Sequence, residues 1–545
     1  MHNGFRRARM AVDLLPHLNL SPSLLALLIA LLAPPALYAL YTLLTYPRNL
    51  PPGPRASFFG WGDHRSLIPR AKPWLKLAEI GEREEYRSRG YYTIWTGPKP
   101  TIVVSSPKVA ADLLDKRSNK YSSRPRFVVM GELATGNNAL LFLPYNAKWR
   151  NQRKIYHSAL MEKRADDYRP IQEWEAKRLC WDFLHHQEGL GWEKCLERYA
   201  ASTVVAIAYG RRVDDVKVGF VQSVIKRMED IGRANLPGKQ VLDTYPILQD
   251  FPEFLTPYKK TWRASRDESH SFWMSLAETV KERMGNGTAA QSFTKDLYER
   301  FDSLGISEEE FGLLTGGIFG AGVETSSGSL IAFVLAMVTH PEAQRKAQQE
   351  LDQVVGSSRS PTWDDEANLP YCRALLKEVL RWRPVAVLGG TPHASTEDDI
   401  YDGYGIPKGS TILCNTWAIH RDPAYFPEPD LFRPERYIED PRESGAMPYP
   451  QKAGHSAFGW GRRICPGMHV AERGLWIAIV HIVHHFTLET PAGAPKPDIF
   501  AFTDGFNSKA EPFPVKATLR GGEEKRKLLA REKEEAWEAL QAYEV

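Results

Sequence analysis

The chain has 545 residues, of which 43% are hydrophobic and 25% are charged, close to ordinary globular usage. This composition excludes a disordered, collagen-like or polytopic membrane protein. The formal net charge of +4 is too small over this length to indicate a nucleic-acid partner. The cysteines lie far apart without a CxxC pair, which argues against a disulfide framework and a structural zinc site.

Residues 24–46 contain no charged side chain. At ~1.5 Å per residue, a helix of this length spans the ~30 Å hydrocarbon core of a bilayer, so we expect one transmembrane anchor after an N-terminal segment, 1–23. The alternative is a cleaved signal peptide, whose apolar region would be only ~7–15 residues long. The proline-rich residues 47–55 predict a stiff hinge.

The remaining chain reads as one large domain, residues 56–520, because it contains no repeat and no low-complexity linker. Residues 91–97 and 101–105 are rich in β-branched and aromatic side chains and predict a β-hairpin. The pattern is then mostly helical to about residue 380, and 398–407 returns to strand and turn chemistry. Residues 521–545 mix both charge signs at helical spacing and predict a solvated C-terminal helix, with a partner contact as the alternative.

The stretch 307–340 predicts an unusually long helix. Ser307 and Glu310 form a capping box, and the pattern ends at His340, before a proline. Each glycine inside a helix costs ~0.5–1 kcal/mol relative to alanine. This helix contains Gly316, Gly317, Gly320 and Gly322. Either a flat or bulky group lies against its backbone, or a neighbouring helix packs closely on it.

Residues 458–467 surround Cys465 with glycines, an arginine two residues before it and an aromatic residue seven before it. A metal-bound sulfur is a thiolate, whose charge backbone N–H groups in glycine turns can stabilise, while an aromatic ring shields it from water. This loop therefore predicts a haem-iron ligand at Cys465. An ordinary structural cysteine in a turn is the alternative.

The loop resembles the haem-thiolate signature of the cytochrome P450 superfamily at Phe458, Gly461, Arg463, Cys465 and Gly467. Further motifs follow the order of that family. Glu378 and Arg381 resemble its ExxR pair, and Arg436 would complete a network that braces the haem-binding core. The resemblance implies the cytochrome P450 fold, mainly α with small β-sheets, for residues 56–520.

Residues 321–326 are similar to the oxygen-activation motif of the same family. Cleavage of iron-bound dioxygen needs protons delivered through a hydroxyl and a carboxylate or water in an apolar pocket. We therefore expect Thr325 and Glu324 to be the catalytic pair, while the Cys465 thiolate donates electron density from the opposite side of the iron.

The resemblance assigns the haem propionates to Trp149 and Arg153, four residues apart on one helical face, together with Arg463 and His393. His393 stands where many relatives carry arginine, so its role depends on its protonation or hydrogen bonding. A surface histidine is the alternative at that position.

The anchor and the resemblance together imply a monooxygenase of the microsomal type on the endoplasmic reticulum membrane, with a cytosolic catalytic domain. Such enzymes bind haem b, use O2 and take electrons from NADPH through a separate reductase, with cytochrome b5 as an optional second donor. Residues 389–423 are most similar to filamentous-fungal members in secondary metabolism, which implies a lipophilic substrate such as an aromatic polyketide, terpenoid or alkaloid. By analogy, the pocket would draw on 127–143, the helix face near Phe319, 385–390 and 502–506.

Two other functions stay open at this point. A reductase-independent haem-thiolate isomerase or dehydratase would keep the fold, but such enzymes usually lack the acid–alcohol pair present here as Glu324 and Thr325. A non-catalytic haem-binding membrane protein would be indicated by loss of Cys465, Thr325 or the ExxR pair, and the sequence retains all of them.

Overall fold

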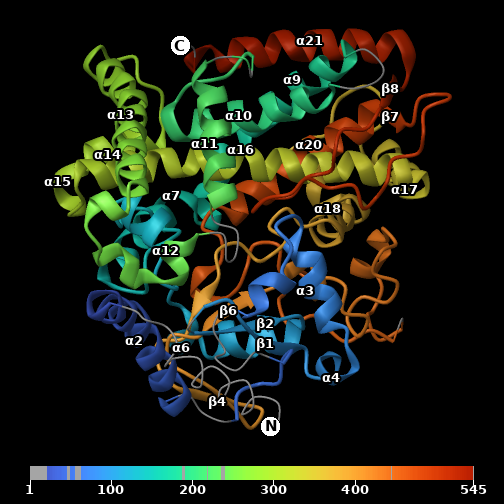
Figure 1. Ribbon diagram of the computed structural model, residues 1–545. Helices are drawn as coiled ribbons and strands as arrows, with labels where there is room; N and C mark the ends of the chain where they lie inside the picture. Colours follow the sequence, from blue (N-terminus) through green and yellow to red (C-terminus); the bar gives the residue numbers. More distant parts are fainter. Residues whose placement is uncertain are drawn as a thin grey trace.

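The computed structural model describes residues 21–45, 49–55, 63–97, 99–186, 191–215, 217, 219–234, 240–443 and 445–543. Most of the expected N-terminal segment 1–23 lies outside the described residues, as do 46–48 and 56–62. In Figure 1, long helices fill the upper part of the molecule. The sheet that contains strands 91–95 and 100–104 lies below them, while strands 486–489 and 516–519 lie beside the upper helices. The architecture is mainly α with small β-sheets, as the sequence predicts.

The helices differ widely in length, and the longest forms the centre of the domain. They are α2 (Pro22–Thr45), α3 (Pro73–Gly81), α4 (Glu84–Arg87), α5 (Pro107–Ala110), α6 (Ser118–Tyr121), α7 (Ala147–Leu160), α8 (Glu162–Ala165), α9 (Arg169–Leu184), α10 (Glu193–Tyr209), α11 (Gly219–Ala234), α12 (Val241–Thr244), α13 (Tyr258–Gly285), α14 (Phe293–Glu299), α15 (Phe301–Leu304), α16 (Glu308–Thr339), α17 (Pro341–Val354), α18 (Pro370–Trp382), α19 (Thr416–Ile419), α20 (Met468–His485) and α21 (Gly522–Leu540). Two short 3-10 turns matter for the site, η9 (Pro434–Tyr437) and η10 (Gly461–Arg463).

The strands form small sheets. They are β1 (Tyr91–Trp95), β2 (Pro100–Val104), β3 (His393–Ala394), β4 (Asp399–Tyr401), β5 (Tyr404–Ile406), β6 (Thr411–Cys414), β7 (Phe486–Glu489) and β8 (Lys516–Leu519). The largest sheet has the order β1-β2-β6-β3, in which β1 and β2 are antiparallel and β6 joins β2 in parallel. The hairpins β1–β2 and β4–β5 confirm the strand predictions at 91–105 and 398–407.

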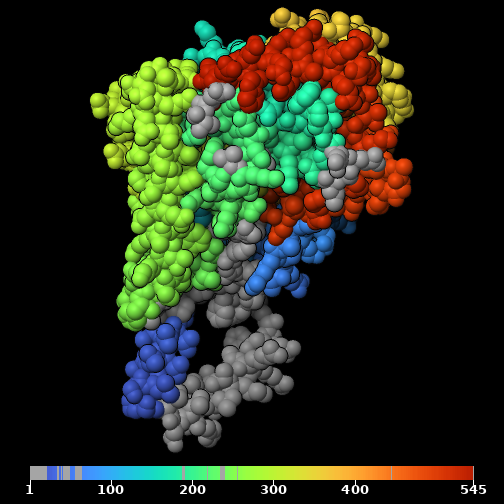
Figure 2. Space-filling model, turned by 90° about the horizontal axis from the view of Figure 1, so that it is seen from above, coloured from blue at the N-terminus to red at the C-terminus, as the bar shows by residue number. Residues whose placement is uncertain are grey.

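The N-terminal helix α2 covers most of the expected anchor, and the leucines described along it are exposed, among them Leu32 and Leu37. Figure 2 shows this helix standing out from the body of the protein. Among the described residues, the one helix long and apolar enough to cross a bilayer is α16, which is mostly buried inside the domain, while Pro22–Ala33 is a shorter apolar stretch. After α2, the N–H of Thr93 donates to the carbonyl of Pro52 at 2.9 Å, so the proline segment lies against β1.

The central helix α16 has the predicted boundaries. Its capping box is present, with the Ser307 hydroxyl accepting from the N–H of Glu310, and it ends before His340. Helix packing explains four of its glycines, because a Cβ at each of these would lie under 3.0 Å from a side chain of another helix. The pairs are Gly316 with Trp273, Gly317 with Tyr156, Gly320 with Met228 and Gly322 with Val204.

The C-terminal helix α21 is present, but it is not solvated on all sides as the charge pattern suggests. Its side chains Leu528, Leu529 and Leu540 are buried, and in Figure 1 it runs along the top of the molecule beside α9. The guanidinium of Arg212 lies 3.6 Å from the ring centre of Trp537. One face of α21 therefore belongs to the folded domain.

Candidate active site

The loop around Cys465 is held tightly between η10 and α20. The N–H of Cys465 donates to the carbonyl of Phe458 at 2.8 Å, which closes the loop. Gly461 has a φ of +56°, its N–H donates to Asp115 Oδ1 at 2.6 Å, and a Cβ there would lie 2.0 Å from the carbonyl oxygen of Leu114. This position of the motif therefore requires glycine for local geometry and for close backbone approach.

The thiol of Cys465 is free and lies deep in the protein, with some exposed surface. Burial raises its pKa, whereas the N–H of Gly467 and the positive charge of Arg153 act in the opposite direction. Coordination to a metal cation removes the thiol proton outright. The loop thus carries the donor groups that a metal-bound thiolate needs.

The side chain of Arg463 is fixed close to Trp149. Its guanidinium lies 4.4 Å from the Trp149 ring centre, and its Nε and Nη2 donate to the carbonyls of Ser122 at 2.7 Å and Leu143 at 2.8 Å. Arg153, one turn along α7 from Trp149, donates to a backbone carbonyl of the cysteine loop. The expected propionate residues Trp149, Arg153 and Arg463 therefore lie together beside that loop.

A third arginine, Arg124, joins this group and was not expected from the sequence. Burial lowers its pKa to about 9 and, with the nearby charges of Arg124 and Arg153, lowers that of Arg463 to about 8. Among the described residues, Arg124, Arg153 and Arg463 donate to backbone carbonyls and make no ion pair with a carboxylate. Clustered, partly buried guanidinium groups without a counter-ion favour an anionic ligand, and they retain N–H groups to donate to one. The donor set, with the Cys465 thiol, fits a haem and its propionates.

His393 is buried in β3, which rules out a surface histidine. Its Nδ1 lies 2.9 Å from the carbonyl oxygen of Tyr121, so Nδ1 carries the proton. Burial and the charges of Arg124 and Arg463 hold the pKa of His393 well below its usual value. The imidazole is therefore neutral, and its Nε2 is a hydrogen-bond acceptor rather than the donor that an arginine would supply.

Thr325 and Glu324 lie on a turn of α16 that is more open than the rest of this core helix, since Ala321 is exposed and Thr325 partly exposed. The hydroxyl of Thr325 donates to the carbonyl of Ala321 at 2.7 Å. The carboxylate of Glu324 accepts from Asn507 Nδ2 at 2.8 Å, and burial raises the pKa of Glu324. The pair combines an oriented hydroxyl with a carboxyl that takes up a proton more readily than usual.

The residues Glu378, Arg381 and Arg436 form a buried charge network. Glu378 and Arg381 are both 0% exposed, and Arg381 donates from Nε and Nη2 to the two carboxylate oxygens at 2.7 and 2.8 Å. Arg436 Nε and the N–H of Arg433 donate to Glu378 Oε1 at 3.0 and 2.9 Å. The network ties α18 to η9, in the segment that leads toward the cysteine loop.

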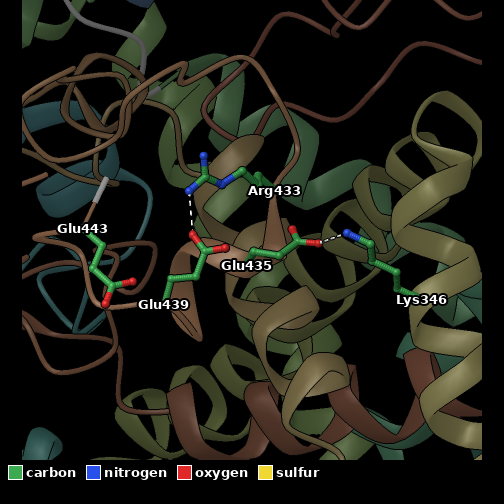
Figure 3. Close-up of a pocket in the computed structure, with 5 residues that line it drawn as sticks. All are labelled: Lys346, Arg433, Glu435, Glu439 and Glu443. Carbon is green, nitrogen blue, oxygen red and sulfur yellow. Dashed lines mark hydrogen bonds and ion pairs between the residues drawn. The ribbon is translucent and has the colours of Figure 1, made fainter. Parts of the chain in front are cut away.

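A charged hollow on the surface lies beside this network (Figure 3). Its cations are paired, Arg433 with Glu439 at 2.8 Å and Lys346 with Glu435 at 2.6 Å, whereas Glu443 has no ion pair among the described residues. The hollow contains no residue of the cysteine loop or of the 321–326 motif. It is therefore separate from the candidate active site.

The segments expected to line a substrate pocket are placed as follows. Phe319 is 0% exposed and packs edge-on against Tyr209, Phe220 and Trp273, so its own ring belongs to the core, while the helix face near it remains an expected part of the pocket. Phe506, in the late loop, lies 3.8 Å from where a Cβ of Gly390 would stand. The segments 385–390 and 502–506 therefore meet, as the analogy implies.

Replacement of Glu378 by glutamine tests the importance of the buried network. Glu378→Gln leaves Arg381 and Arg436 buried without their anion, which is expected to lower the free energy of unfolding by about 3–5 kcal/mol. Thermal and denaturant unfolding would measure this. Glu443→Gln, in the exposed hollow, is the control and should change stability by less than about 0.5 kcal/mol. Equal stability of both variants would contradict the role of the network.

The comparisons with known proteins agree with this geometry. The family model described as cytochrome P450 matches residues 51–517. Cytochrome P450 monooxygenase 58 of Postia placenta is 36% identical over 450 residues, covering 82% of this chain and 83% of the relative. Cytochrome P450 monooxygenase verL of Clonostachys rogersoniana is 35% identical, covering 81% and 80%.

Solved structures show the same fold. A zebrafish cytochrome P450 structure with abiraterone has a TM-score of 0.68 and 24% identity, covering 83% of this chain and all of that one. The family model covers most of the chain, and the curated relatives match over four fifths of it. Together with the geometry of the cysteine loop, these matches show that this chain is a member of the cytochrome P450 family, whose curated fungal relatives are monooxygenases.

Proposed function

We propose that the protein inserts one oxygen atom of O2 into a lipophilic small molecule, using a haem held by Cys465. The observation that carries this proposal is the cysteine loop, in which the Gly467 N–H and Arg153 act on the partly exposed thiol of Cys465 beside an arginine cluster. When bound, the haem supplies the iron at which oxygen is reduced and activated. Cys465 would be its axial ligand, and Trp149, Arg124, Arg153 and Arg463 would hold its propionates.

Proton delivery is assigned to the open turn of α16. The Thr325 hydroxyl is held by the Ala321 carbonyl and presents its oxygen as an acceptor for a further proton donor. Glu324 can hold a proton because burial raises its pKa, and Asn507 fixes the orientation of its carboxyl group. The pair would pass protons to the reacting oxygen while the apolar surroundings limit access of bulk water.

The substrate class and pathway rest on the resemblance to fungal enzymes. The curated relatives named above come from fungi. The apolar segments 385–390 and 502–506 are suited to a lipophilic molecule such as an aromatic polyketide, terpenoid or alkaloid of secondary metabolism. A reductase-independent isomerase or dehydratase is the second candidate, but the retained acid–alcohol pair favours the monooxygenase.

Electrons would come from NADPH through a separate cytochrome P450 reductase, with cytochrome b5 as an optional second donor. Arg150 and Lys154 are both exposed on α7, the helix that also carries Arg153. Their positive charges would attract an acidic electron donor to the side of the cysteine loop. An anchored enzyme and an anchored reductase would meet on one membrane face.

Placement in the endoplasmic reticulum membrane rests on α2. This helix is 24 residues long, uncharged, and exposes its described leucines. At ~1.5 Å per residue it is long enough for the ~30 Å hydrocarbon core. A single N-terminal span with a cytosolic catalytic domain follows from this proposal.

Replacement of the proposed iron ligand tests the haem-thiolate assignment. Cys465→Ser should abolish the strongly red-shifted Soret band of the reduced carbon monoxide complex, because a serine oxygen cannot provide the thiolate. Cys195→Ser, a partly buried cysteine on α10, is the matched control and should keep the band. The assignment fails if Cys465→Ser retains the thiolate-type spectrum.

Replacement of the proposed proton-delivery hydroxyl tests the reaction class. With NADPH and a reductase, Thr325→Ala should bind haem normally but form product about tenfold more slowly or worse, and release more hydrogen peroxide per NADPH. Thr325→Ser keeps a hydroxyl and should stay close to the wild type. Product formation without reductase would instead support the isomerase, and undiminished coupling in Thr325→Ala would remove the role of this hydroxyl.

Deletion of the anchor tests the membrane placement. The full chain should remain with membranes after an alkaline carbonate wash, whereas a variant lacking residues 1–46 should move largely to the soluble fraction, because no other apolar helix in the described chain is exposed along its length. Immunodetection in both fractions measures the ratio. Loss of the full chain during the wash would rule out a spanning helix.

A further inference from the structure

A second cysteine, distant in sequence from the haem-binding loop, is buried with two histidines. Cys180 lies on α9, and His481 and His485 lie near the end of α20. All three are 0% exposed, and one possible ligand atom from each lies within 4.8 Å of the others. In Figure 1, α9 and α20 lie in the same upper part of the molecule, beneath α21.

The arrangement follows from the helices. Residues four apart share one face of an α-helix, so His481 and His485 point to the same side of α20. That side packs against α9, which brings in Cys180 among the buried Leu179 and Phe183. Paired histidines at this spacing are a common way for a helix to bind a metal ion.

The hydrogen bonds around His485 fix which of its nitrogens is free. The Ser360 hydroxyl donates to Glu532 Oε2 at 2.6 Å and lies 2.7 Å from His485 Nε2. Because the hydroxyl proton goes to Glu532, Nε2–H of His485 donates to Ser360. The Nδ1 of His485 then carries a lone pair, and it has no hydrogen-bond partner among the described residues. A histidine oriented through its second nitrogen toward a carboxylate is typical of metal ligands.

His481 is the residue that most needs an explanation. Neither of its ring nitrogens has a hydrogen-bond partner of ordinary geometry in the described part of the chain, although the Pro361 carbonyl lies toward the ring. A fully buried imidazole with unsatisfied nitrogens is costly and rare in native proteins. A metal ion would take one of these lone pairs, and Pro361 could then accept from the other nitrogen.

We propose that Cys180, His481 and His485 form a structural site for a transition-metal ion, with Zn²⁺ as the expected ion. A thiolate and imidazoles are the ligands that Zn²⁺ prefers, at about 2.3 Å for sulfur and about 2.0–2.1 Å for nitrogen. Ligand atoms in such a site are about 3.5 Å apart, so side-chain movements of about 1 Å would close the present cluster.

Charged side chains around Cys180, His481 and His485 would affect the binding of a metal cation. Lys177 and Lys525 lie near His481, and their positive charges oppose a bound cation. Lys525 Nζ donates a hydrogen bond to Nε2 of His484, and His484 is not one of the three proposed ligands. The thiolate of Cys180 and the carboxylate of Glu532 would supply the negative charge that a divalent cation needs.

The site would connect three helices. Cys180 belongs to α9, the histidines to α20, and Glu532 to α21, which lies outside the region matched by the family model. Since α20 starts just after Cys465, a metal at its far end would hold in place the helix that follows the haem-binding loop. The site is thus a structural brace rather than a second reaction centre.

Metal analysis of the full, haem-containing chain tests the proposal. Protein produced with zinc and copper in the medium and then passed through a desalting column should contain about one zinc per polypeptide by mass spectrometry of the elements. Normalising to polypeptide makes the result independent of haem loading. X-ray absorption at the zinc edge should show one sulfur and two or more nitrogen or oxygen neighbours.

Variants identify the ligands. Cys180→Ser and His481→Ala should each lower zinc content at least tenfold, and Cys372→Ser, a buried cysteine on α18, should leave it unchanged. If these variants fail to fold, the absorption spectrum of the unaltered protein still decides. Protein free of both zinc and copper, a metal shell without sulfur, or metal retained in Cys180→Ser would overturn the proposal. Copper in place of zinc, lost in the same variants, would keep the site but overturn the assignment of zinc.

Discussion

The buried carboxylate of Glu378 is the interaction on which the active-site region depends. It is 0% exposed and is shared by the side chains of Arg381 and Arg436 and by a backbone N–H. Burial of these charges is tolerated only when each has an opposite charge or a hydrogen-bond partner. Because the partners lie on both α18 and η9, these two elements can adopt few arrangements relative to each other. Arg381 also donates to the carbonyl of His420, and the His420 ring bonds to Ser456, just before the cysteine loop. The charge network thereby fixes the start of the segment that presents Cys465.

The arginine cluster beside the cysteine loop differs from this network. Its positive charges lie close together, but no carboxylate of the described residues pairs with them. Arg124, Arg153 and Arg463 are partly or fully desolvated, and their side chains reach backbone carbonyls rather than carboxylates. Such a cluster destabilises the chain by itself. Binding of an anionic cofactor would offset this repulsion and, by mass action, stabilise the folded state. Cofactor binding and folding are therefore coupled in this part of the molecule.

Local patterns predicted local structure well. The capping box of α16, the hairpins β1–β2 and β4–β5 and the helical character of α21 follow from residues close in sequence. The residues that sequence reasoning missed act over long distances. Asn507 reaches Glu324 from a loop 183 positions away, and nothing in its neighbourhood marks it as a partner. The glycines of α16 fitted either a flat ligand or close packing, and only the positions of Trp273 and its neighbours decide for packing.

Contacts between residues far apart in sequence also explain why the buried face of α21 could not be predicted. Lys525 and Glu532 read as solvated charges, yet both are 5% exposed because they meet His484 and Ser360 from other elements. A search of the sequence for closely spaced cysteines also misses the cluster around Cys180. Its neighbours His481 and His485 lie about 300 residues further along the chain. Charged side chains that a helix buries need partners of defined chemistry. The contacts of Lys525 and Glu532 therefore make α21 a specific part of the domain, one that could not be replaced by any helix of similar charge and length.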